Sequence, residues 1–147
     1  MWSVSVTGPV RRARPKPIDP AVPLRPETAR ALERGRILYN AGRYFEAHEA
    51  WEAAWIVEDG EPRLLLQGLI QVAAGYLKAV AHRRPGGAAR LLAAGLGKLA
   101  PLPDGFAGLS LASFRDRVGR SLAEVRRWIA GDRTGIDPSL APPLERA

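Results

Sequence analysis

The spacing of turn residues constrains this chain more than any other feature. Between Pro26 and Gly131 the turn signals recur at helix-length intervals, and no alternation of apolar and polar residues bounded by hairpin turns indicates a strand. We therefore predict an all-α fold. The predicted helices cover about residues 27–40, 43–57, 61–84, 88–99 and 110–130, with Ser110 as the N-cap of the last helix and Gly131 following its end.

The short connections between the first three predicted helices favour antiparallel neighbours. The expected architecture is a compact bundle of about five helices, built from antiparallel helical hairpins over residues 27–131. Residues 1–26 hold six prolines and no apolar period, which predicts a disordered basic arm. Residues 132–147 are again rich in proline and are expected to form a C-terminal tail.

The composition narrows the class of protein. The chain has no cysteine, which excludes disulfides, thiolate metal sites and a cysteine nucleophile. No apolar run approaches the ~20 residues that a membrane helix requires. The N-terminal apolar residues precede the charges, which is the reverse of a secretory signal. We therefore expect a cytoplasmic protein with no membrane partner.

The net charge of +7 is unevenly distributed along the chain. The arm over residues 1–26 holds Arg11, Arg12, Arg14, Lys16 and Arg25 against the single acidic residue Asp19. The helical region is therefore closer to neutral. Nucleic-acid association through the basic arm is an alternative function rather than the leading one.

The predicted helix over residues 43–57 carries polar side chains inside its apolar arc. On a helical wheel Tyr44, Trp51 and Trp55 form a narrow stripe, and His48 and Glu52 project beside it, one turn apart. Flanking apolar residues are Phe45, Ala47, Ala54 and Ile56, Glu49 lies at the border of the arc, and the expected solvent face is Glu46, Ala50, Ala53 and Val57. Buried polar groups need partners. His48 and Glu52 therefore either fix the packing of this helix through hydrogen bonds or line a pocket.

The predicted helix over residues 61–84 is apolar around most of its circumference, as expected for a central helix. Its one polar stripe consists of Gln67, Gln71, Lys78 and His82. This stripe is either a solvent edge or, through Gln67 and Gln71, the second wall of a polar pocket opposite His48 and Glu52. Gly68 and Gly75 indicate close approach by another backbone or a ligand, because glycine disfavours a helix interior.

The string His48-Glu49-Ala50-Trp51-Glu52 partly matches the HExxH helix of zinc proteases. That motif requires a second histidine at the position that Glu52 occupies here, since two histidines one turn apart hold the zinc. A zinc protease is therefore not predicted. A looser divalent-metal site using His48 and Glu52 stays open, and no other cofactor is expected.

The segment from Tyr44 to Glu52 also resembles a known family, the small bacterial and archaeal proteins catalogued as domain of unknown function 309. Their signature is a Phe/Tyr-Glu-Ala-His-Glu-x-Trp-Glu helix followed by a Leu-Leu-Gln-Gly-Leu-Ile-Gln helix, and the second element is similar to Leu65–Gln71. The segment from Gly86 to Leu92 fits a third helix of the family. The resemblance extends over about residues 28–130 and implies a compact all-α fold, without implying an activity.

The leading functional hypothesis is a non-catalytic binding or interaction module with a polar pocket between the second and third helices. Its candidate residues are His48, Glu49, Trp51, Glu52, Gln67 and Gln71, and its partner is a protein or a small molecule. The first alternative is a metal-dependent or acid–base enzyme using His48, Glu49 and Glu52. A homodimer is a further option that the sequence leaves open.

Overall fold

The computed structural model describes residues 8, 14 and 16–147. Five α-helices follow one another in the chain: α1 (Pro26–Asn40), α2 (Tyr44–Trp55), α3 (Gly60–Val80), α4 (Pro85–Leu99) and α5 (Leu111–Ile129). Two short 3-10 helices, η1 (Phe106–Gly108) and η2 (Pro138–Leu140), complete the secondary structure. Over these described residues there is no β-strand, only an isolated bridge between Leu109 and Arg146. The predicted all-α fold is therefore confirmed.

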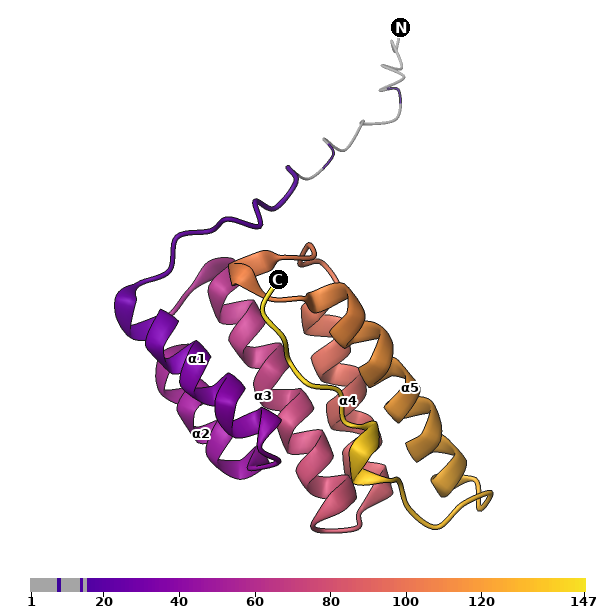
Figure 1. Ribbon diagram of the computed structural model, residues 1–147. Helices are drawn as coiled ribbons and strands as arrows, with labels where there is room; N and C mark the ends of the chain where they lie inside the picture. The colour runs from indigo at the N-terminus through magenta and orange to yellow at the C-terminus, as the bar shows by residue number, and fades with distance from the viewer. Residues whose placement is uncertain (1–7, 9–13, 15) are drawn as a thin grey trace, which may run out of the picture.

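Helices that are consecutive in the chain pack against one another and form a compact bundle (Figure 1). The central helix α3 contacts both α2 and α4, and its core-facing side chains, such as Leu69 and Tyr76, are fully buried. It ends at Val80, because Arg83 adopts a left-handed conformation (φ 51°) in the turn that follows. His82, predicted as part of the polar stripe of this helix, therefore lies beyond it and is exposed. None of the helices in the described part of the chain is long and apolar enough to cross a membrane.

Glycines allow α3 and α4 to approach closely. A Cβ atom on Gly95 would lie 2.8 Å from the carbonyl oxygen of Gly68, and a Cβ atom on Gly75 would lie 2.8 Å from the side chain of Leu92. A side chain at either position would collide with the opposite helix. The close approach predicted at Gly68 and Gly75 is confirmed, and the neighbour is the helix α4.

The last helix, α5, buries the apolar face that its sequence predicts. Leu111, Phe114, Val118, Leu122 and Val125 are all buried in the bundle core. At its C-terminal end Trp128 is half-buried beneath the guanidinium of Arg83, which lies 5.2 Å from the ring centre. Ile129 points outward with 53% of its surface exposed.

The segment predicted as a C-terminal tail, residues 132–147, packs against the bundle instead of extending from it. It runs across the helices between α1 and α5 (Figure 1), where Ser121 of α5 donates a hydrogen bond to the carbonyl of Leu140 at 3.2 Å. The Tyr39 hydroxyl donates to the carbonyl of Pro142 at 2.8 Å, and the Asn40 amide bonds both the N–H (2.8 Å) and the carbonyl (3.0 Å) of Leu144. Because these side chains satisfy its backbone, the segment stays on the bundle without forming a long helix.

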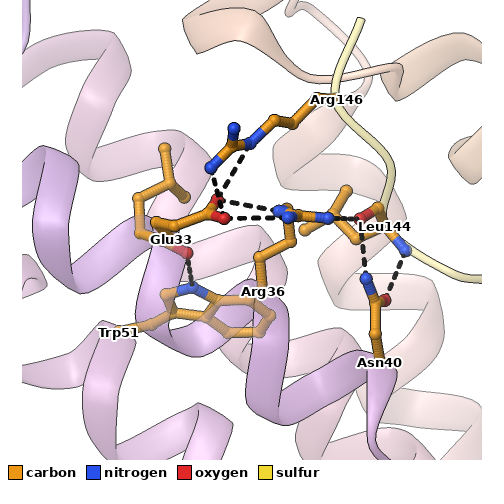
Figure 2. A network of polar contacts seen from close by, with 7 residues as sticks. Glu33, Arg36, Asn40, Trp51, Leu144 and Arg146 are labelled. Carbon is orange, nitrogen blue, oxygen red and sulfur yellow. Dashed lines mark hydrogen bonds and ion pairs between the residues drawn. The ribbon is translucent and has the colours of Figure 1, made fainter.

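An ion-pair network holds the same segment to α1 (Figure 2). Glu33 accepts hydrogen bonds from Arg36 at 2.8 Å and from Arg146 at 3.3 Å, and Arg36 also donates to the carbonyl of Leu144. The hydrogen bond from Arg36, assisted by Arg146, lowers the pKa of Glu33 to about 2. The pairs are partly solvent-exposed, so each contributes no more than about 1 kcal/mol to stability.

Part of the segment predicted as a disordered arm is also packed. Ile18, Val22 and Leu24 lie against the core, and the carbonyl of Pro20 accepts a hydrogen bond from the N–H of Ala107 at 3.1 Å. The predicted arm therefore includes an ordered portion that continues into α1. Arg11 and Arg12, two of the five basic residues on which the nucleic-acid alternative depends, lie outside the described residues.

Candidate functional site

The orientation of α2 determines which of its side chains can meet a ligand. Trp51 points into the core, whereas Phe45 and Ile56, predicted as flanks of the apolar arc, are 56% and 66% exposed. Gly35 of α1 explains this orientation, because a Cβ atom there would lie only 2.1 Å from the indole nitrogen of Trp51. The missing side chain of Gly35 makes room for the indole ring, and α2 is turned further towards α1 than the hydrophobic pattern predicts.

Trp51, predicted as a pocket residue, lies in the core. Its side chain is fully buried, and its Nε1–H donates a hydrogen bond of 3.1 Å to the carbonyl of Leu32 (Figure 2). It also packs against Tyr39, with ring centres 6.1 Å apart. Its polar atom is satisfied within the fold, so Trp51 has a structural role here.

A small hollow lies between α2 and α3. It has a volume of ≈ 180 Å³ and is lined by Glu52 and Trp55 from α2 and by Gln67, Ile70 and Gln71 from α3. The fold thus brings together Glu52, Gln67 and Gln71, three of the side chains predicted to form a polar pocket. That the hollow binds a ligand stays a prediction.

His48 lies one turn of α2 before this hollow. Its Nε2 atom is 3.7 Å from an Oε atom of Glu52, and its ring stacks on Phe45 with ring centres 6.1 Å apart. This pair supplies only two metal-binding side chains. Within residues 8, 14 and 16–147, no group of three or more His, Cys, Asp or Glu side chains could hold a metal ion.

Glu49 does not join the other predicted site residues. Its side chain is exposed and lines a separate groove, formed with α1 residues such as Arg34 and Leu38. It lies three residues from Glu52, yet it faces α1 while Glu52 faces α3. The structure therefore places Glu49 and Glu52 at different hollows, and a joint role for His48, Glu49 and Glu52 stays a prediction.

Buried polar atoms without partners gather at this place. Among the described residues, three buried side-chain atoms lack a hydrogen-bond partner: His48 Nδ1, Trp55 Nε1 and Gln71 Oε1. All three come from the surface that we call the α2–α3 face, made of Phe45, His48, Glu52, Trp55, Ile56, Gln67, Ile70 and Gln71. Each such atom costs about 1–3 kcal/mol when it is left unsatisfied. Elsewhere in residues 8, 14 and 16–147 the buried side-chain polar atoms have partners, so this face is the exception.

We expect Gln71→Leu to raise the free energy of unfolding by about 1 kcal/mol, because it removes a buried acceptor without a partner and adds apolar surface. The matched control is Gln67→Leu, since Gln67 also lines the hollow but has no unsatisfied buried atom. Urea unfolding of both variants measures the difference. A loss of stability in Gln71→Leu, with Gln67→Leu unchanged, would show that Gln71 has a structural partner.

Sequence reasoning did not assign Phe45, Trp55, Ile56 or Ile70 to the site. The sequence did contain a signal for the exposed residues Phe45 and Ile56. They lie seven residues before and four residues after Glu52, so all three side chains share one stripe of the helix. Trp55 is covered on one side by the guanidinium of Arg63, 4.3 Å from the ring centre. The tight α2–α3 connection brings these two residues together.

Residues 32–91 match the model of the family described as Domain of unknown function (DUF309). The match runs from α1 into α4 and includes all of α2 and α3, so it contains the whole α2–α3 face. The resemblance predicted from the sequence is confirmed over this range, which is shorter than the expected 28–130. No curated protein matches the chain.

Proposed function

We propose that this helical domain is a non-catalytic binding module that receives a protein partner on its α2–α3 face. The observation that carries the proposal is that two residues lining the hollow, Trp55 and Gln71, hold unsatisfied buried polar atoms, Nε1 and Oε1. Once the Trp55 or Gln71 side chain turns its buried atom toward the hollow, a group that enters can supply the hydrogen bond that the fold itself does not provide. Glu52, at the edge of the same hollow, adds a charged acceptor.

The dimensions favour a protein partner over a cofactor. Pockets for drug-sized ligands usually measure about 300–1,000 Å³. A hollow of ≈ 180 Å³ is suited to a single side chain. Phe45 and Ile56 lie exposed on either side of it along α2, eleven residues apart, which corresponds to about 16 Å of helix. A partner segment that places one polar side chain in the hollow can contact both apolar residues.

The geometry also supports the non-catalytic part of the proposal. The enzyme alternative depends on His48, Glu49 and Glu52 acting together, but Glu49 faces the opposite edge of α2. The cysteine-free composition fits a reducing compartment, so we place this binding function in the cytoplasm.

The test begins with a random peptide-display library selected against the full chain, followed by affinity measurements on the enriched peptides. We expect Ile56→Asp to weaken binding by about tenfold or more, because it places a charge in an apolar contact. The matched control is Ile129→Asp on α5, since both isoleucines are exposed near a helix end, by 66% and 53%. The control variant should bind as well as the unchanged chain.

Two results would contradict the proposal. The first is a selection that enriches no peptide. The second is a set of peptides that bind Ile56→Asp and Ile129→Asp equally well. Circular dichroism of both variants checks that the helices are retained.

A divalent metal at His48 and Glu52 is the second candidate. The observation in its favour is that Glu52 shares the hollow with Gln71, whose Oε1 is an unpartnered oxygen and so the candidate for a third donor. Titration of the dialysed protein with Zn²⁺ or Mn²⁺ tests it. Binding that is lost in both His48→Ala and Gln71→Leu would favour a metal site, whereas binding that is retained in either variant would not.

A further inference from the structure

The opposite edge of α2 forms a second groove, together with α1. One hollow of ≈ 430 Å³ is lined by Ala31, Arg34 and Leu38 of α1 and by Glu46, Glu49, Ala50 and Ala53 of α2. A second hollow of ≈ 560 Å³ is lined by α1 residues that again include Arg34 and Leu38, together with Ile37. The two hollows share residues, so they form one continuous surface, which we call the α1–α2 face.

The floor of the α1–α2 face is made of small and apolar side chains. Ala31, Ala50 and Ala53 leave both helix backbones open to close approach, and Ile37 is 56% exposed. Alanine-lined helix surfaces allow another helix to pack at the short end of the usual 8–10 Å spacing. The face is therefore suited to helices rather than to an extended chain or a small molecule.

The charges on the two edges of the groove have opposite signs. Arg34 and Arg30 lie on the α1 edge and Glu49 on the α2 edge, and none of the three forms an ion pair with another described residue. The other two carboxylates of this face are paired within the chain, Glu46 with Arg43 and Glu33 with Arg36. A strongly acidic or strongly basic partner would meet repulsion on one of the two edges. A partner with the same arrangement of charges would not.

We propose that the α1–α2 face binds a second copy of this chain. A twofold axis parallel to the helices places α1 of each copy over α2 of the other, so that Arg34 meets Glu49 of the other copy at two equivalent positions. Such a self-complementary patch is what a twofold dimer requires. The result is a four-helix arrangement across the interface. It leaves the α2–α3 face free, and it does not depend on the function proposed for that face.

The experiment is sedimentation equilibrium of the full chain, with charge reversals at the two edges. We expect the unchanged chain to dimerise with a dissociation constant below ~100 μM. Arg34→Glu and Glu49→Arg should each weaken dimerisation by about tenfold or more, because each reversal puts two charges of the same sign opposite one another at both equivalent positions of the dimer. The double variant Arg34→Glu/Glu49→Arg restores opposite charges and should recover most of the affinity. Arg126→Glu on α5, an exposed arginine far along the chain from this face, is the control for net charge and should leave dimerisation unchanged.

A monomeric chain at ~100 μM would overturn the proposal. So would a dimer that is unaffected by the single reversals, or a double variant that is weaker than both. All the substituted residues are exposed, so thermal unfolding should be nearly unchanged and the variants remain folded for the measurement.

Discussion

Replacing Gly35 with alanine should lower the free energy of unfolding by about 3 kcal/mol or more, at the upper end of what overpacking costs in a core. The added Cβ atom would lie 2.1 Å from Nε1 and 2.4 Å from Cδ1 of Trp51, which is far inside van der Waals contact. Trp51 is fully buried, so its ring has no free space to enter. Relief of the clash requires α1 and α2 to separate, which breaks the hydrogen bond from Trp51 to Leu32. Urea unfolding followed by tryptophan fluorescence measures the loss.

Gly119→Ala is the matched control, because Gly119 lies inside α5 and an added Cβ atom would meet no neighbour within 4 Å. Alanine is the better helix former by about 0.5–1 kcal/mol, so this variant should be more stable than the unchanged chain. Opposite signs for the two substitutions are expected. Equal effects would show that the fit of α1 against Trp51 is looser than the structure indicates.

Replacing Leu144 with alanine should cost about 2–5 kcal/mol, as for other fully buried leucines. Leu144 is fully buried although it lies only three residues from the end of the chain, and it fills a site beside Asn40 and Arg36 (Figure 2). Loss of its side chain leaves a cavity and loosens the segment that covers α1 and α5. Thermal unfolding of the variant provides the measurement.

Glu145→Ala is the matched control, because Glu145 lies next to Leu144 in the chain but is not buried. It therefore distinguishes the effect of losing a buried side chain from the effect of any substitution at this place. Glu145 is exposed, and its contribution to the fold is a backbone carbonyl that accepts a hydrogen bond from the N–H of Ser110 at 2.9 Å. Alanine keeps that bond, so the change in stability should stay within about 0.5 kcal/mol. A similar small effect for Leu144→Ala would mean that the C-terminal segment contributes little to stability and behaves as the predicted tail.

The helices could be predicted because their signals are local. The turn at Asn40-Ala41-Gly42 joins α1 to α2 as predicted, and the apolar period of α5 identifies its buried face. Pro85-Gly86-Gly87, predicted as a break before a helix at residue 88, forms the first turn of α4. The orientation of α2 could not be predicted in the same way. It depends on Gly35, a residue of another helix, whose missing side chain admits Trp51.

The packing of the two proline-rich ends was missed for a related reason. Proline-rich segments lack a hydrophobic period, and their composition is typical of disorder. Here the backbone of the C-terminal segment is satisfied by Tyr39 and Asn40 at the end of α1, more than one hundred residues earlier in the chain. A side chain that bonds so distant a segment leaves no signal in the local sequence.

The candidate site was predicted in part. Glu52, Gln67 and Gln71 were identified because each interrupts an apolar pattern, and they do line one hollow. Trp51 and Glu49 were assigned to the same site because the helical wheel places Trp51 beside His48 and Glu52 and places Glu49 at the border of the arc, but one faces the core and the other faces α1. Neighbours on a helix that are one or three residues apart can face different surroundings, and the wheel alone does not show what those surroundings are.

The most direct test of the proposed binding function is an NMR measurement of the tryptophan indole N–H signals, assigned by tryptophan-to-phenylalanine variants. A selected peptide is added to the full chain. We predict that the Trp55 signal shifts, because its Nε1 has no partner and the residue lines the hollow, while the Trp51 signal stays in place, because its Nε1 is bonded to Leu32 in the core. A stationary Trp55 signal at saturating peptide would contradict the assignment of the α2–α3 face as the binding site.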